Sequence, residues 1–225
     1  MVSEDMAFPF STVSEVECVR CQHHSLHVYN VNMNLTPYHH GNLRTALVEQ
    51  GLVLLEASDQ ADLSLRELAR RVGVSANAAY RHFANKDALL AALAAEGFRR
   101  FNVTQIRAAT GEVDQASSFR QAGRAYVQFA QDNPALFRLM FGRSTAKEET
   151  EELKQASQAS FETLKMAVAQ LAGLPIDDPQ VTVKAMIAWS LVHGLSHLAL
   201  DGRLDHLGEG ANAVIDQIIS HLDKP

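Results

Sequence analysis

The side chains best suited to recognising another molecule lie close together in one short segment. Asn77 can pair with the edge of a nucleic-acid base, and Arg81 can bind either guanine or a phosphate. Tyr80, His82 and Lys86 carry hydrogen-bond donors suited to phosphate oxygens, which set the position of a protein on DNA. The segment therefore has the chemistry of a DNA-binding surface.

Two short helices are expected to position these side chains. Ser64 and Glu67 have the spacing of a capping box, and Gly73 supplies the residue at which the first helix ends. Ser75 can cap a second helix over residues 76–83, which begins with small residues that let the backbone approach DNA. This spacing is typical of a helix-turn-helix. The alternative is an incidental packing of three helices that binds no DNA.

Length and composition place the chain among ordinary globular proteins. Its 225 residues are 47% hydrophobic and 20% charged. The net charge of -6 argues against non-specific coating of nucleic acid, although residues 38–86 hold six basic and five acidic side chains. Residues 1–32 lack the basic start and apolar region of a secretory signal, and we expect no membrane span. A cytoplasmic location is the default expectation.

Helical periodicity continues to the end of the chain, and no alternating strand pattern competes with it. We expect a leading helix from Gly41 to about residue 58. Further helices are expected near 86–109, 116–132, 134–142, 147–173, 179–201 and 208–223. The predicted fold class is all-α with about nine helices. A disordered leader (1–36) precedes a helix-turn-helix domain (37–86) and a helical effector-binding and dimerisation domain (87–225). Translation from Met33 is an alternative account of the leader.

Three motifs make the helix-turn-helix specific. Leu65–Ser75 (LRELARRVGVS), Ala79–Phe83 (AYRHF) and Asn85–Leu90 (NKDALL) together resemble the DNA-binding domain of the TetR family of repressors. Tyr38–Arg44 (YHHGNLR) is similar to the family's entry into its first helix. The residues and the resemblance together predict DNA contacts at Thr36, Tyr38, His39, Ser64, Leu65, Arg66, Ser75, Ala76, Asn77, Ala78, Tyr80, Arg81, His82 and Lys86.

The C-terminal part resembles a subgroup of the same family. Asn133–Phe141 (NPALFRLMF) and Ala188–Leu195 (AWSLVHGL) look like its C-terminal domain with a Trp…His-Gly signature. The resemblance implies a pocket between the middle helices, with candidate residues Phe119, Tyr126, Phe137, Met140, Phe141, Phe161, Trp189 and His193. It also implies a homodimer built on the last two helices, with candidate interface residues Val192, His197, Val214, Ile215, Ile218, Ile219 and Leu222.

Trp189, His193 and His197 share one helix face by their spacing. They can form a pocket wall with a hydrogen-bonding imidazole, or they can belong to a dimer interface or the core. The sequence leaves both open.

The expected function is a transcription regulator, most simply a repressor that a small apolar or aromatic effector releases from a palindromic operator. Activation remains an alternative. Two classes compete with a regulator of this kind. Cys18, Cys21, His23, His24 and His27 could bind zinc and make the chain a metal or redox sensor, although chance ligands in a flexible leader are the simpler interpretation. The second competing class is an enzyme with an all-helical fold, but we find no nucleophile arrangement or phosphate loop. We expect no enzyme activity, metal, cofactor or membrane partner.

Overall fold

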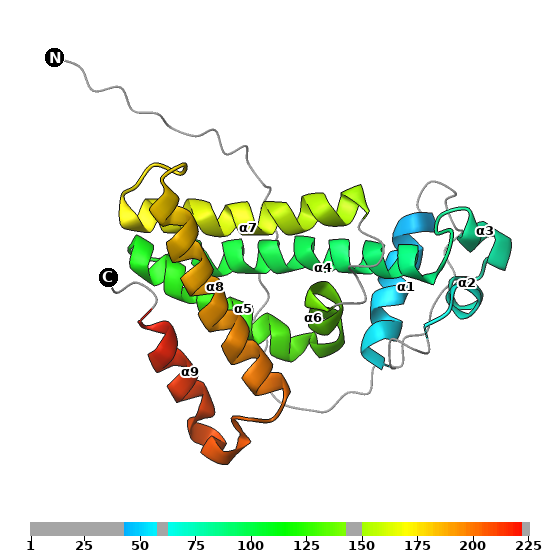
Figure 1. Ribbon diagram of the computed structural model, residues 1–225. Coiled ribbons are helices and arrows are strands. Elements are labelled where there is room, and N and C mark those ends of the chain that lie inside the picture. Colours follow the sequence, from blue (N-terminus) through cyan, green and yellow to red (C-terminus); the bar gives the residue numbers. More distant parts are fainter. Residues whose placement is uncertain (1–42, 58–62, 143–149, 222–225) are drawn as a thin grey trace, which may run out of the picture. The chain divides into compact units, whose positions relative to one another are not determined.

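The computed structural model describes residues 43–57, 63–142 and 150–221. These residues belong to one compact unit that spans His39–Pro225. The described part of the chain contains nine α-helices and one 3-10 helix, with no strand (Figure 1). The predicted all-α class is therefore confirmed.

The helices follow one another with short connections. Their bounds are α1 Leu43–Ala57, α2 Leu65–Val72, α3 Ala76–Tyr80, α4 Lys86–Ala109, α5 Gln115–Asp132, α6 Pro134–Phe141, α7 Glu151–Ala172, α8 Pro179–Leu200, a 3-10 helix Asp205–Gly210 and α9 Ala211–Ile219. Helix α4 begins at the last residue of the predicted DNA-binding domain. One continuous helix thus leads from the helix-turn-helix into the C-terminal bundle.

Side-chain caps explain most helix starts. Asp114 accepts from the backbone amide of Ser117, Thr150 from that of Leu153, and Asp178 from that of Gln180. Each bond satisfies one of the amides that a first helical turn leaves without an intrahelical partner.

The last helix is shorter than expected. The sequence predicted one helix over 208–223, but α9 begins at Ala211. Gly208 has φ 56° and ψ −137°, a conformation that no α-helix contains, and a 3-10 helix occupies Asp205–Gly210 instead.

Two layers of packing hold the unit together. Helices α1, α2 and α3 enclose a core with the first turns of α4, where Leu47, Leu68, Leu89 and Leu93 are fully buried. Further along, α4 lies between α5 and α7, and α8 packs across α5 and α7 (Figure 1). Because α4 contributes to both layers, it connects the helix-turn-helix mechanically to the bundle.

Candidate nucleic-acid interface and ligand cavity

The turn between α2 and α3 is built by local hydrogen bonds. The Ser64 hydroxyl accepts from the Glu67 amide, and the Ser75 hydroxyl accepts from the Ala78 amide, each at 3.2 Å. Gly73 has φ 78°, the left-handed region that favours glycine. Its backbone amide donates to the carbonyls of Ala69 and Arg70, which ends α2. Gly73 and the Ser75 cap form the tight turn that the sequence predicted, while the Ser64 cap begins α2.

One face of α3 packs into the protein core, and the opposite face is exposed to solvent. Ala79 is fully buried and Phe83 is nearly so. Asn77, Arg81 and Tyr80 are exposed, with Tyr80 43% exposed. An exposed tyrosine on a short helix leaves its hydroxyl available to a partner.

Several predicted DNA contacts need correction or lie outside the description. Leu65 is only 4% exposed, because it packs into the core below α2, so its side chain cannot contact DNA. Ala78 is half-buried and packs against the same core. Thr36, Tyr38 and His39 fall outside the described residues, as does the cysteine and histidine cluster of the leader. The remaining candidates are exposed or partly exposed, namely Ser64, Arg66, Ser75, Ala76, Asn77, Tyr80, Arg81, His82 and Lys86.

Only half of the expected capping box forms. The Glu67 carboxylate does not reach back to Ser64; it accepts from Arg70 at 2.7 Å and from Arg71 at 2.9 Å. These hydrogen bonds lower the pKa of Glu67 to about 2. Two of the arginines on α2 are thereby paired within their own helix.

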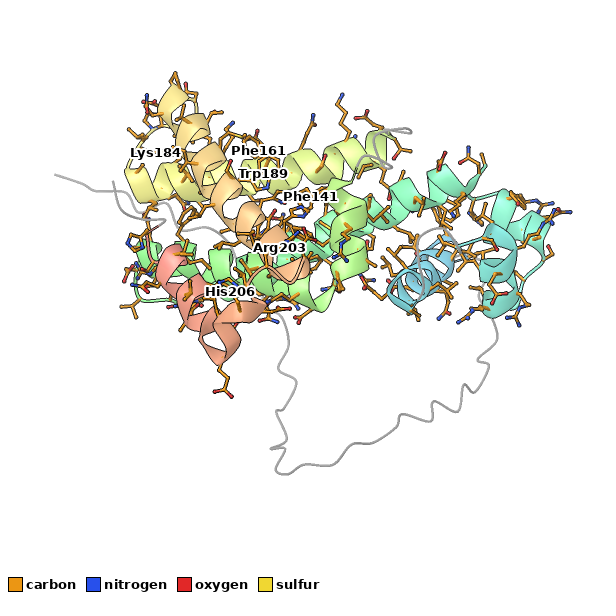
Figure 2. The ribbon with its side chains drawn as sticks, turned by 60° about the horizontal axis from the view of Figure 1, so that its bottom comes forward. Phe141, Phe161, Lys184, Trp189, Arg203 and His206 are labelled. Atoms are coloured by element: carbon orange, nitrogen blue, oxygen red, sulfur yellow. The ribbon has the colours of Figure 1, made fainter. Side chains whose placement is uncertain are left out.

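A cavity of about 660 Å³ lies in the C-terminal bundle, among α4, α5, α7 and α8. Its wall includes most of the aromatic side chains of the region, and Figure 2 shows Phe141, Phe161 and Trp189 gathered there from α6, α7 and α8. The Trp189 ring lies 6.0 Å from Phe161 and 6.3 Å from Phe141, centroid to centroid. A volume of this size and an aromatic lining are typical of a small-molecule site.

The sequence identified part of this wall. Phe119, Tyr126, Phe141, Phe161 and Trp189 line the cavity as predicted. Phe137, Met140 and His193 do not line it: they lie behind the wall, where Phe137 is fully buried and packs on Phe141.

The wall also contains residues that the sequence analysis missed. Phe98, Phe101 and Gln105 on α4 line the cavity, as do Gln158 and Ser160 on α7. The spacing of the three α4 residues marks one helix face and could have revealed them.

A hydrogen-bonded chain joins α5 to α8 at the cavity wall. Trp189 Nε1 donates to Tyr126 Oη at 3.1 Å, and Tyr126 Oη lies 2.8 Å from His193 Nδ1. Burial raises the pKa of Tyr126, so its hydroxyl keeps its proton. Burial, together with the nearby charge of His197, lowers the pKa of His193. The phenol can therefore donate to a neutral imidazole.

Direct contacts tie α1 to the bundle. Glu56 near the end of α1 accepts from the Leu136 amide at 2.8 Å and the Ala135 amide at 3.3 Å, both in the first turn of α6. Arg44 at the other end of α1 pairs with Glu152 on α7 and lies 5.3 Å from the centre of the Phe83 ring. The helix-turn-helix and the cavity-bearing bundle are thus joined at both ends of α1.

Part of the predicted dimer interface is buried within this chain. Val192, Ile215 and Ile219 are at most 6% exposed, because they pack into the core of the bundle. His197 and Ile218 are half-buried, Val214 is 36% exposed, and Leu222 lies outside the described residues.

Helix α8 carries four of the large apolar side chains that are exposed on the described residues. Its exposed large side chains are Val183, Met186, Ile187 and Leu198. Of the helices described, α8 alone is long and apolar enough to cross a membrane by length and composition, and 28% of its most apolar window is buried. Exposed apolar side chains that lie next to one another are typical of a surface that binds a partner.

Comparisons with known proteins agree with this arrangement. A family model described as bacterial regulatory proteins of the tetR family matches residues 47–93, and one described as a tetracyclin repressor-like C-terminal domain matches residues 119–222. The comparison with curated proteins found no match.

Solved structures share the fold. The chain is 34% identical to a protein of unknown function from Rhodococcus sp. RHA1, over 84% of this chain and 97% of that one, with a TM-score of 0.71. It is 10% identical to the fatty acid degradation regulator FadR from Bacillus halodurans, over 82% and 96% of the two chains, with a TM-score of 0.60. It is 20% identical to a TetR variant from Acinetobacter baumannii AYE in complex with minocycline, over 79% and 92%, with a TM-score of 0.54.

A helix-turn-helix linked by one long helix to a bundle with an aromatic cavity defines a ligand-responsive, DNA-binding transcription regulator. The chain belongs to the TetR family of bacterial regulatory proteins.

Proposed function

We propose that the protein is a homodimeric repressor, acting in the cytoplasm, that leaves a palindromic operator when a small aromatic compound fills the C-terminal cavity. The observation that carries the proposal is the continuity of α4. This helix begins three residues after Phe83, just beyond α3 in the chain, and carries Phe98 and Phe101 into the cavity wall. A ligand that displaces α4 displaces the helix-turn-helix with it.

On the DNA side, we assign base recognition to Asn77 and Arg81. Their exposure over a buried Ala79 supports this role. Tyr80, His82 and Lys86 are assigned to phosphates.

At the start of α2, Ser64 and Arg66 are exposed and can also contact phosphates. Leu65 can contribute only its backbone amide, because its side chain is buried.

Fluorescence anisotropy with the DNA upstream of the gene tests these roles. Arg81→Ala should cost about 1–3 kcal/mol of binding free energy and change the sequence preference. Tyr80→Ala should weaken binding to all sequences alike. Arg107→Ala, an exposed arginine near the far end of α4, is the matched control. Unchanged affinity in both test variants would overturn the assignment.

The dimer is proposed to cover the apolar face of α8. A second copy would hide Val183, Met186 and Ile187 at once, and a two-fold axis would set the two α3 helices about 34 Å apart, one turn of DNA.

Ile187→Glu should shift the protein to a monomer in light scattering after size exclusion. Val113→Glu changes an apolar residue that is 96% exposed between α4 and α5, and it should leave the dimer intact. A dimer in both variants would contradict the proposed interface.

Coupling between the cavity and the operator is proposed to run through α4 and α6. Phe141 at the end of α6 lines the cavity, and the first turn of α6 binds Glu56 of α1. A coupling of about 1–3 kcal/mol would suffice for regulation.

A further inference from the structure

The cavity has an aromatic wall whose polar atoms are already engaged. Trp189 uses its only N–H on Tyr126, and Tyr126 has His193 as the acceptor for its hydroxyl. The neighbouring rings of Phe101 and Phe141 carry no polar atom. On this side a ligand therefore meets aromatic surfaces, which favour an aromatic partner.

Two glutamines on the cavity wall, by contrast, have side-chain amides that can still bind a ligand. Half-buried Gln105 on α4 and exposed Gln158 on α7 both line the cavity, and no hydrogen bond to another described residue engages either side-chain amide. The two helices run side by side in the same direction (Figure 1), and Arg99 bonds Glu152 at 3.1 Å.

Gln105 lies six residues after Arg99, and Gln158 lies six residues after Glu152. Because each residue advances a helix by about 1.5 Å, the two glutamines lie at about the same level along the two helices. Each amide can donate two hydrogen bonds and accept others. Together they can bind a carbonyl, amide or hydroxyl group from two sides.

The charges of the lining residues limit which ligands the cavity can bind. Among the described residues, no lysine, arginine or histidine lines the cavity, and the single charged lining residue is Glu162. Glu162 is 55% exposed and pairs with Lys165 at 3.2 Å. An ionised carboxylate or phosphate on the ligand would lose its water without gaining an opposite charge, which is costly.

We propose that the cavity selects an uncharged aromatic compound with a carbonyl or amide group, and that Gln105 and Gln158 bind this polar group. The inference rests on the proposed function in taking the cavity as the effector site. The cavity volume of about 660 Å³ lies within the usual range for drug-sized ligands. The two glutamines are thus specificity-determining residues, while the aromatic wall supplies most of the contact area.

Three probes with the same ring system separate these contributions: 2-naphthamide, 2-naphthoate and 2-methylnaphthalene. Calorimetric titration of the full chain at pH 7.5 gives their affinities. Trp189 is the only tryptophan of the chain and lines the cavity, so its fluorescence reports occupancy independently. We expect 2-naphthamide to bind about tenfold more tightly than 2-naphthoate and severalfold more tightly than 2-methylnaphthalene.

Two variants test the role of the glutamines. Gln105→Leu and Gln158→Leu should each reduce the preference for 2-naphthamide over 2-methylnaphthalene, and the double variant should abolish it while 2-methylnaphthalene still binds. Gln170→Leu, on α7 but outside the cavity lining, should keep the preference.

Two kinds of failure are distinguishable. If 2-naphthoate binds as tightly as 2-naphthamide, or if the double variant keeps the preference, the inference is wrong while the cavity remains an effector site. If no probe binds and Trp189 fluorescence does not respond, both the inference and the effector part of the proposed function are wrong. The operator-binding assignments to Asn77 and Arg81 would stand in either case.

Discussion

Replacing Glu56 tests whether α1 caps a helix of the bundle. Helix α6 has no cap of its own, because Asn133 at its start makes no side-chain bond to the first turn and donates instead to the Phe129 carbonyl. Glu56 takes this role across the fold by accepting from the amides of Leu136 and Ala135. Glu56→Ala leaves both amides without a protein partner.

The expected loss can be worked out from general values. Removing a capping side chain costs about 0.5–2 kcal/mol, and losing a negative charge near a helix start costs about 0.3–1 kcal/mol. Because Glu56 is exposed and water can replace it in part, we expect a total of about 1 kcal/mol. For a chain of this size, that lowers Tm by about 2–4 °C.

Glu56→Gln makes the prediction sharper. Glutamine keeps one acceptor oxygen but not the charge, so its loss should be smaller than that of Glu56→Ala. Thermal unfolding by circular dichroism at one fixed protein concentration measures both losses. Glu112→Ala, an exposed glutamate between α4 and α5, is the control and should leave Tm unchanged.

Coupling between the cavity and the DNA-binding site should weaken together with the stability of the fold. In Glu56→Ala a cavity ligand should release DNA less completely, because α6 no longer binds α1. A Tm within 1 °C of the wild type, or equal losses for alanine and glutamine, would refute the capping argument.

Three further changes have defined outcomes. Gly97→Ala places a new Cβ 2.7 Å from Sδ of Met140, so we expect a loss of about 1–3 kcal/mol in chemical denaturation, partly recovered by Met140→Val. Because the pKa of His193 lies below its ordinary value of 6.5, the unfolded chain binds more protons below that pH. Stability should therefore fall as the pH drops below about 6.5, and less steeply in His193→Gln; equal pH profiles would contradict this. Glu152→Gln removes the anionic partner of both Arg44 and Arg99, and its cost of about 1 kcal/mol at low salt should shrink in 1 M NaCl, whereas a salt-independent cost would exclude an ionic origin.

The helix-turn-helix could be predicted because local contacts build it. Ser64, Ser75 and Asn85 each cap a helix through an amide three residues away, and Gly73 ends α2 by its own backbone conformation. Such signals are complete within four or five residues, so they are readable in the sequence.

Local patterns were less informative where a residue's neighbours come from elsewhere in the chain. Leu65 stands beside exposed residues in the sequence, yet it is buried, and the half-buried Ala78 packs against the same core. Their burial depends on how α2 and α3 rest against α1 and α4, which no short segment specifies.

The amino-acid sequence by itself determined the helical class, the tight turn after α2 and the polar face of α3. Only the tertiary structure decided that Phe141 faces a cavity while Phe137, one turn earlier, is buried behind it. It also decided that Ile215 is used inside the chain while Ile187 is left exposed. Periodicity marks which side chains must leave water, but the packing of distant helices chooses what covers them.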